Sequence, residues 1–222
     1  MGDYSFLVNG ESAPGGDDGL PLRERKKRET RQRISDIATG LFAERGFDAV
    51  TVAEVARAAG VSAMTVFNYF PRKEDLFLDR IPQAAELFAG AVRDRAPDEP
   101  PLAALRRLAL RLLDERHPLS GVGERYPRFF RIVIASPALR SRAREGVEEV
   151  ERALAAALAD AGTPDPRLLA ALAVAAYRTV FLASVDRLLA GDPVAEVARS
   201  HRARLEAAFT ALERTGLDGS WC

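Results

Sequence analysis

Two hydrogen-bonding side chains, Thr65 and Asn68, lie three residues apart in a short segment that also carries Ala63 and Met64. In a helix, residues with this spacing lie on the same side. Thr and Asn can exchange hydrogen bonds with base edges, and Ala and Met can touch thymine methyl groups. The residue types therefore predict a helix that contacts bases in the major groove of DNA.

The same region supplies groups suited to a phosphate backbone. Tyr69 and Lys73 can contact phosphates, which position a protein on DNA without distinguishing its sequence. Thr51 and Ser62 stand where two helices are expected to begin, and free N–H groups and the helix dipole favour a phosphate there. All four residues are predicted DNA contacts.

Two short helices joined by a tight turn would position these groups. Thr51 and Glu54 have the spacing of a capping box at a helix start. Residues 60–62, Gly-Val-Ser, fit the turn of a helix-turn-helix, whose second helix enters the major groove. The residues of that second helix expected to pack inward are Val66, Phe67 and Phe70. Short helices with glycine turns also occur in bundles that bind no DNA.

A local basic segment precedes or opens the first helix. Seven basic and two acidic residues lie between Arg23 and Arg33, whereas the whole chain carries 32 basic and 32 acidic residues. A positive segment in a neutral chain suggests an anionic partner. Arg28 and Arg31 are the predicted DNA contacts in it, and a solvated helix start is the open alternative.

The stretch from Arg31 to Leu76 resembles the DNA-binding domain of TetR-family regulators. The matching residues are Ile34, Ala38, Leu41, Phe42, Gly46, Phe47, Thr51, Val52, Val55, Ala56, Ala59, Gly60, Val61, Ser62, Thr65, Val66, Phe67, Tyr69, Phe70, Lys73, Glu74, Asp75 and Leu76. Two positions depart from the family pattern: Phe67 replaces the usual tyrosine, and Pro71 replaces a small polar residue.

The resemblance implies an all-α fold, with an N-terminal three-helix helix-turn-helix domain followed by a larger helical ligand-binding and dimerisation domain. It also implies a homodimer on a palindromic operator of double-stranded DNA. Most members of the family are repressors that a small-molecule effector releases from DNA, and the sequence does not distinguish a repressor from an activator. The expected domains are a disordered tail at 1–22, the DNA-binding domain at 23–72, the helical domain at 73–216 and a C-terminal tail at 217–222.

Apolar and aromatic side chains after residue 72 suggest a pocket for a lipophilic effector, with an acyl-type ligand as one candidate. The predicted ligand-binding residues are Leu105, Leu108, Leu112, Tyr126, Phe129, Phe130, Tyr177 and Phe181. The alternative is that these side chains form an ordinary core. A DNA-binding protein without an effector would need no such cavity.

Two apolar stripes near the C-terminus suggest a dimer interface, which the resemblance implies is a four-helix bundle across a two-fold axis. The predicted interface residues are Leu172, Ala176, Thr179, Ala183, Leu205, Phe209 and Leu212. The alternative is that both stripes face the chain's own core.

Pro82 stands within the segment 72–95, which the sequence predicts to be helical. Proline inside a helix removes a hydrogen bond and clashes with the preceding turn. A kink near residues 78–82 is therefore expected, as either a hinge for the effector signal or a static bend.

Several function classes have little support in the sequence. Only two histidines, His117 and His201, are present, and no catalytic or nucleotide-binding motif occurs in a fitting context, so no enzyme, metal site or cofactor is expected. The single cysteine, Cys222, fits a reducing cytoplasm. The apolar stretch 168–185 contains Arg178, which disfavours a membrane span.

Overall fold

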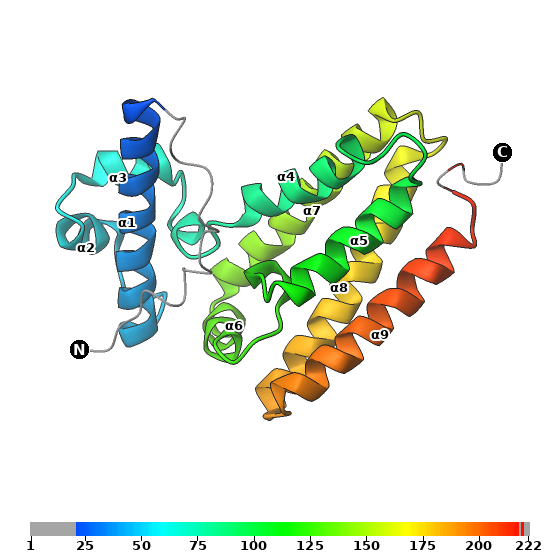
Figure 1. Cartoon of the computed structure of the whole chain (residues 1–222). Helices are drawn as coiled ribbons and strands as arrows, with labels where there is room; N and C mark the ends of the chain where they lie inside the picture. Colours follow the sequence, from blue (N-terminus) through cyan, green and yellow to red (C-terminus); the bar gives the residue numbers. More distant parts are fainter. Residues whose placement is uncertain (1–20, 218, 220–222) are drawn as a thin grey trace. The chain divides into compact units, whose positions relative to one another are not determined.

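The computed structural model describes residues 21–217 and 219, and every regular element in this part of the chain is a helix. The elements in chain order are α1 (Leu22–Arg45), α2 (Val52–Ala58), α3 (Ala63–Tyr69), the 3-10 helix η2 (Lys73–Leu76), α4 (Ile81–Arg93), α5 (Pro101–Asp114), the 3-10 helix η3 (Pro118–Ser120), α6 (Tyr126–Ala135), α7 (Pro137–Asp160), α8 (Pro166–Ala190) and α9 (Val194–Glu213) (Figure 1). The predicted all-α fold is confirmed. Most of the predicted N-terminal tail, residues 1–20, and most of the C-terminal tail lie outside the described residues.

Most helix ends follow the local signals in the sequence. Helix α1 ends at Arg45 and is capped by Gly46, which has a φ of 84° and donates its N–H to the carbonyl oxygen of Phe42. The Asp165 side chain accepts a hydrogen bond from the Leu168 N–H at the start of α8. Gly191 ends that helix in the left-handed conformation, which glycine adopts without a steric penalty.

The predicted continuous helix across Pro82 is wrong. The chain instead forms the short η2, and α4 begins at Ile81, so that Pro82 falls in its first turn. A proline there lacks an N–H that would have no partner within the helix, and its fixed φ suits a helix start. Pro82 therefore stands at a helix start and kinks no helix.

The described chain divides into two compact units. The first unit contains the described residues up to Asp79 together with Arg128–Arg142, and the second contains Arg80–Pro127 and the described residues from Ala143 onward. Most of α6 and the first residues of α7 thus belong to the first unit. From the sequence, by contrast, everything after residue 72 was expected to form the later helical domain and its tail.

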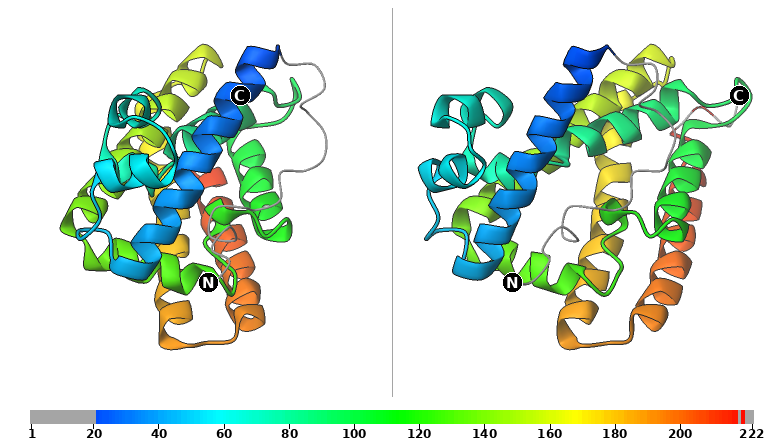
Figure 2. Two further views of the ribbon diagram at one scale, coloured as in Figure 1. Left: turned by 90° about the vertical axis from the view of Figure 1, so that its left-hand side faces the viewer. Right: turned by 60° about the vertical axis from the view of Figure 1, so that its left-hand side comes forward.

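The core of the second unit is formed by side chains from α4, α5, α7, α8 and α9. Leu105, Leu158, Leu169 and Phe209 are among its fully buried members. Helices α8 and α9 lie side by side along their length, joined by a short connection after Gly191 (Figure 2). Burial of these apolar side chains supplies the main driving force for packing of the unit.

Candidate nucleic-acid interface

The first unit is built around the inner faces of α1, α2 and α3. Ile34 and Phe42 of α1, Val55 of α2 and Val66 of α3 have no exposed surface, and Phe70 is 1% exposed. These side chains fix the three helices against one another, so the outer face of α3 is held on a rigid support.

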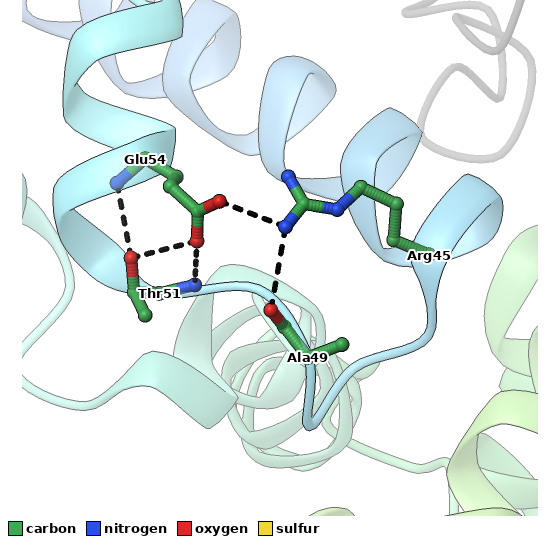
Figure 3. Close-up of polar contacts among 4 residues, drawn as sticks. All are labelled: Arg45, Ala49, Thr51 and Glu54. Carbon is green, nitrogen blue, oxygen red and sulfur yellow. Dashed lines mark hydrogen bonds and ion pairs between the residues drawn. The ribbon is translucent and has the colours of Figure 1, made fainter.

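The start of α2 is fixed by the predicted capping box. The Glu54 N–H donates to the Thr51 hydroxyl oxygen, and the Thr51 N–H donates to the Glu54 carboxylate at 2.8 Å (Figure 3). Arg45 also donates to this carboxylate at 2.8 Å and reaches the carbonyl oxygen of Ala49 (Figure 3). These bonds, led by that from the Thr51 backbone, lower the pKa of Glu54 to about 2. The carboxylate therefore stays ionised and keeps the cap intact at neutral pH.

The turn between α2 and α3 has the conformation that its glycine permits. Gly60 has a φ of 66°, and the Val61 N–H donates to the carbonyl oxygen of Ala56. Ser62 then caps α3, since its hydroxyl oxygen accepts from the Thr65 N–H at 3.0 Å. The two hydroxyl oxygens of Ser62 and Thr65 lie 2.8 Å apart and share a second hydrogen bond.

The outer face of α3 differs from the prediction at one position. Met64 is 70% exposed, and Ala63 and Asn68 are also exposed, as expected of base-contacting residues. Phe67, expected to pack inward, is 46% exposed, whereas the half-buried Tyr69 packs against the core. In a helix of only seven residues, Val66 and Phe70 already occupy the inward positions, and Phe67 is left on the outer surface.

Two predicted phosphate contacts are cations that lie over aromatic rings. The ammonium of Lys73 lies 4.3 Å from the ring centre of Phe47, and the guanidinium of Arg31 lies 4.5 Å from that of Phe70. Such contacts restrain a long side chain while leaving its charge available. Lys73 follows α3 in the chain, and Arg31 lies over the ring of Phe70 at the C-terminal end of α3.

The basic segment forms the first turns of α1. Helix α1 begins at Leu22, residues 21–29 are all exposed, and the first buried position is Ile34. Arg28 is exposed, and the nearby ion pair of Arg25 with Glu29, at 3.8 Å, is a surface contact. The segment is thus a regular helix that extends beyond the core.

A segment distant in sequence completes this unit, and the sequence did not predict its place there. The ring of Phe129 in α6 stacks on that of Phe77 with a centre distance of 4.8 Å. At the start of α7, Arg142 donates to Asp75 at 2.7 Å, and both side chains are largely buried. No local signal in the sequence indicates these partners, because they lie more than fifty residues away along the chain.

Comparison with known proteins agrees with the geometry of α1–α3. Residues 34–79 match the sequence model described as "Bacterial regulatory proteins, tetR family". The chain is 33% identical over 147 residues to the HTH-type transcriptional regulator TcmR of Streptomyces glaucescens, covering 64% of each chain. The chain is therefore similar to TetR-family regulators over this segment. Its helix-turn-helix, formed by α2 and α3, lies within the residues that match the TetR-family model.

Other transcriptional regulators match shorter or less similar parts of the chain. The HTH-type transcriptional regulator AcrR of Shigella flexneri is 32% identical over 95 residues, covering 41% of this chain and 43% of AcrR. A TetR-family regulator from Streptomyces coelicolor has a solved structure with a TM-score of 0.53 and 25% identity, covering 88% of this chain and 99% of that one. The chain thus spans less than two thirds of the length of the curated relatives it matches.

The residues predicted to line a ligand pocket are not gathered in one place. In the second unit, Leu105, Leu108, Leu112 and Tyr177 are at most 8% exposed within the core, Phe181 is partly buried against it, and Tyr126 donates its hydroxyl to the carbonyl oxygen of Arg116. Phe129 and Phe130 belong to the first unit. Aromatic composition does not distinguish a core side chain from a pocket wall, so the sequence could not separate these groups.

The predicted dimer residues divide between the core and a groove. Leu205 and Phe209 have no exposed surface and face the core of their own unit, and Leu212 packs against the same core. Leu172, Ala176 and Ala183 are partly exposed, and Thr179 is exposed. Ala176 and Thr179 line an open groove of ≈ 400 Å³ between α8 and α9, together with Ala175, Val180, Arg204, Ala207 and Ala208.

Helix α8 is long and apolar enough to cross a membrane by length and composition alone. Its buried residues, among them Leu169, Val180 and Leu188, line the core clusters of the second unit. Arg178 and Asp186 are exposed on the same helix. Packing in a helical core accounts for the apolar character of α8.

Proposed function

We propose that the chain is a cytoplasmic, sequence-specific transcriptional regulator that binds a palindromic operator as a homodimer and is released by a lipophilic small molecule. The observation that carries this proposal is the exposed outer face of α3, held on a capped and packed helix-turn-helix. Asn68 and Met64 would contact bases. Arg28, Arg31 and Lys73 would contact phosphates.

Selection of genomic fragments on the purified full chain, followed by footprinting, tests DNA binding. The proposal expects one enriched palindrome, protected symmetrically on both half-sites, at a salt concentration that suppresses nonspecific binding. Finding no enriched sequence under these conditions would contradict the proposal. A change in transcription of the gene next to the palindrome, on deletion of the regulator, would distinguish repression from activation.

The homodimer proposal is supported by the open groove between α8 and α9. Small side chains such as Ala175 and Ala207 allow close approach of a second helix pair. Leu168 and Leu182 add apolar surface to α8, with 44% and 49% exposure. A second copy of the chain, related by a two-fold axis, would bury this face on both protomers.

Thr179→Arg tests the homodimer, because it places a bulky charge in the groove. We expect sedimentation to give a dimer for the natural chain and a monomer for Thr179→Arg at micromolar concentration. Ala195→Arg, at an exposed position of α9 outside the lining of the groove, is the matched control and should stay dimeric. A natural chain that sediments only as a monomer would contradict this part of the proposal.

The effector proposal rests on the contacts between η3 and α8. The Tyr177 hydroxyl donates to the carbonyl oxygen of Leu119 at 2.8 Å, and the Tyr177 ring packs edge-on against Phe88. A Cβ atom at Gly121 would lie within 2.4 Å of the Phe181 ring, so the segment after η3 lies directly on α8. We propose that an effector opens this contact, inserts its apolar part beside Phe181 and uses the freed Tyr177 hydroxyl.

Thermal melting with decanoic acid or its coenzyme A thioester tests the effector proposal. We expect one of these probes to raise the melting temperature by several degrees and to release the operator fragment, since ligand binding stabilises the folded state. Tyr177→Phe should weaken the effect, and Thr215→Val, which removes an exposed hydroxyl after α9, should not. If neither probe stabilises the chain and neither releases the operator fragment, the result would favour a DNA-binding protein without a lipophilic acyl effector.

A further inference from the structure

The outer face of α3 is apolar and carries no charge. None of the seven residues of α3 is ionisable at neutral pH. Met64 and Phe67 lie three residues apart, and neighbours with this spacing contact each other on a helix surface. They are two of the six large apolar side chains that are exposed in the described chain, although α3 is among its shortest helices. Such a concentration of apolar surface suggests an apolar partner group.

Asn68 carries the only amide of α3, and the half-buried Tyr69 is the predicted phosphate contact of this helix. The Thr65 hydroxyl is hydrogen bonded to that of Ser62 at 2.8 Å, so the helix cap already occupies it. The exposed Asn68 has no hydrogen-bonding partner among the described residues. Asn68 follows Met64 by one helical turn, which places its amide beside the Met64–Phe67 pair.

The cations of this unit named above lie outside that face. Arg31 sits over the ring of Phe70, and Lys73 sits over the ring of Phe47. Bidentate contact with guanine requires an arginine or a lysine in the groove, whereas asparagine pairs with adenine, and the thymine methyl is the apolar group of the major groove. The side chains of α3 therefore match A·T pairs and lack the group that selects guanine.

We infer that Met64 and Phe67 together select thymine methyl groups in each operator half-site and that Asn68 contacts an adjacent adenine. This inference rests on the proposed function, because it specifies the bases that the proposed interface selects. Phe67 is thereby a specificity-determining residue, a role that the expectation of inward packing had excluded.

Deoxyuridine substitution tests the inference, because it removes only the thymine methyl group. Each contacted thymine of the footprinted operator is replaced in turn, and the dissociation constant is measured at one salt concentration. Loss of one buried methyl should weaken binding by the natural chain about four-fold. Met64→Ala or Phe67→Ala should bind the natural operator more weakly and lose sensitivity to the substitution at the thymine each contacts.

A matched control separates this effect from general loss of apolar surface. Ile134 in α6 is 49% exposed, close to the value for Phe67, and belongs to the same unit. Ile134→Ala should therefore retain the full deoxyuridine effect. Tight operator binding that is insensitive to deoxyuridine at every thymine would overturn the inference and leave the proposed function standing. Absence of any specific operator would overturn both.

Discussion

The two units of the chain differ in how their candidate functional residues are presented. In the first unit, Met64, Phe67 and Asn68 are exposed on a helix whose start and inner face are fixed. In the second, Leu105, Leu108 and Tyr177 are buried in a packed core. The first unit thus has an exposed contact surface, whereas the proposed effector of the second unit would have to displace packed side chains. The proposed effector site therefore requires a conformational change that the proposed DNA interface does not.

The largest expected effect tests whether the stability of the first unit depends on the first residues of α7, which belong to that unit. Arg142→Ala removes the ion-pair partner of Asp75 in a largely buried position and leaves the carboxylate only the N–H of Arg72. Removing one member of a buried pair should cost about 3–5 kcal/mol of stability, measured by urea unfolding. Arg107→Ala breaks the exposed pair with Glu99 and should cost less than about 1 kcal/mol. Equal decreases in stability for the two variants would show that the α7 segment is not integral to the first unit.

The second prediction concerns the interior of the second unit. Burial, with a smaller contribution from the Arg204 charge, lowers the pKa of His201 to about 4. A histidine in the unfolded chain has a pKa of about 6.5. Below this pH, His201 therefore binds a proton more readily in the unfolded chain than in the folded chain. Stability should then fall as the pH drops from about 6.5 toward about 4, by up to about 2 kcal/mol at about pH 5.

Urea unfolding at neutral and mildly acidic pH checks the contribution of His201. The variant His201→Leu should lose clearly less stability than the natural chain over this range. Glu54 does not interfere, because its lowered pKa removes stability only at more acidic pH. Parallel pH dependence in the natural chain and His201→Leu would refute the assignment to His201.

The third prediction tests the local support of the contact surface. Thr51→Ala removes the hydroxyl from the α2 capping box and should cost about 1 kcal/mol, with a matching decrease in operator affinity if the cap orients α2 and α3. Thr30→Ala, in the interior of α1, is the control and should change stability little. If Thr51→Ala unfolds at the same urea concentration as the natural chain, packing alone fixes α2.

The smallest expected effect concerns the exposed start of α1. Replacing Lys27 and Arg28 with Gln should reduce the slope of log K against log salt by about 0.9 for each phosphate that the variant no longer neutralises. The matched pair of changes, Arg111→Gln and Arg199→Gln in the second unit, should leave the slope unchanged. The same slope in both double variants would identify the basic segment as a solvated helix start.

The parts of the fold that the sequence predicted are those set by local contacts. Thr51 and Ser62 cap helices as expected, because a cap bonds residues only three positions ahead. Asp192 precedes Pro193, which is a common sequence pattern at a helix start, but its side chain pairs with Arg187 and does not cap α9. A capping residue next to a nearby arginine has two local partners, and the sequence does not determine which one it takes.

The parts that the sequence missed depend on distant contacts. Placement of Phe129 against Phe77 and of Arg142 against Asp75 requires the tertiary fold. Phe67 was assigned inward because aromatic side chains are commonly buried, yet its neighbours already fill the inner face of α3. The helix-turn-helix was recognisable from the sequence, but the exposure of Phe67 on its outer face was not.

Equilibrium binding of the selected palindrome by the natural chain and by Asn68→Ala tests the central claim most directly, that the outer face of α3 contacts operator bases. Gln83→Ala, an exposed amide on α4, is the control. We predict about ten-fold or greater reduction of affinity for Asn68→Ala at fixed salt, with binding by Gln83→Ala unchanged. Equal affinities for the natural chain and Asn68→Ala would contradict the claim.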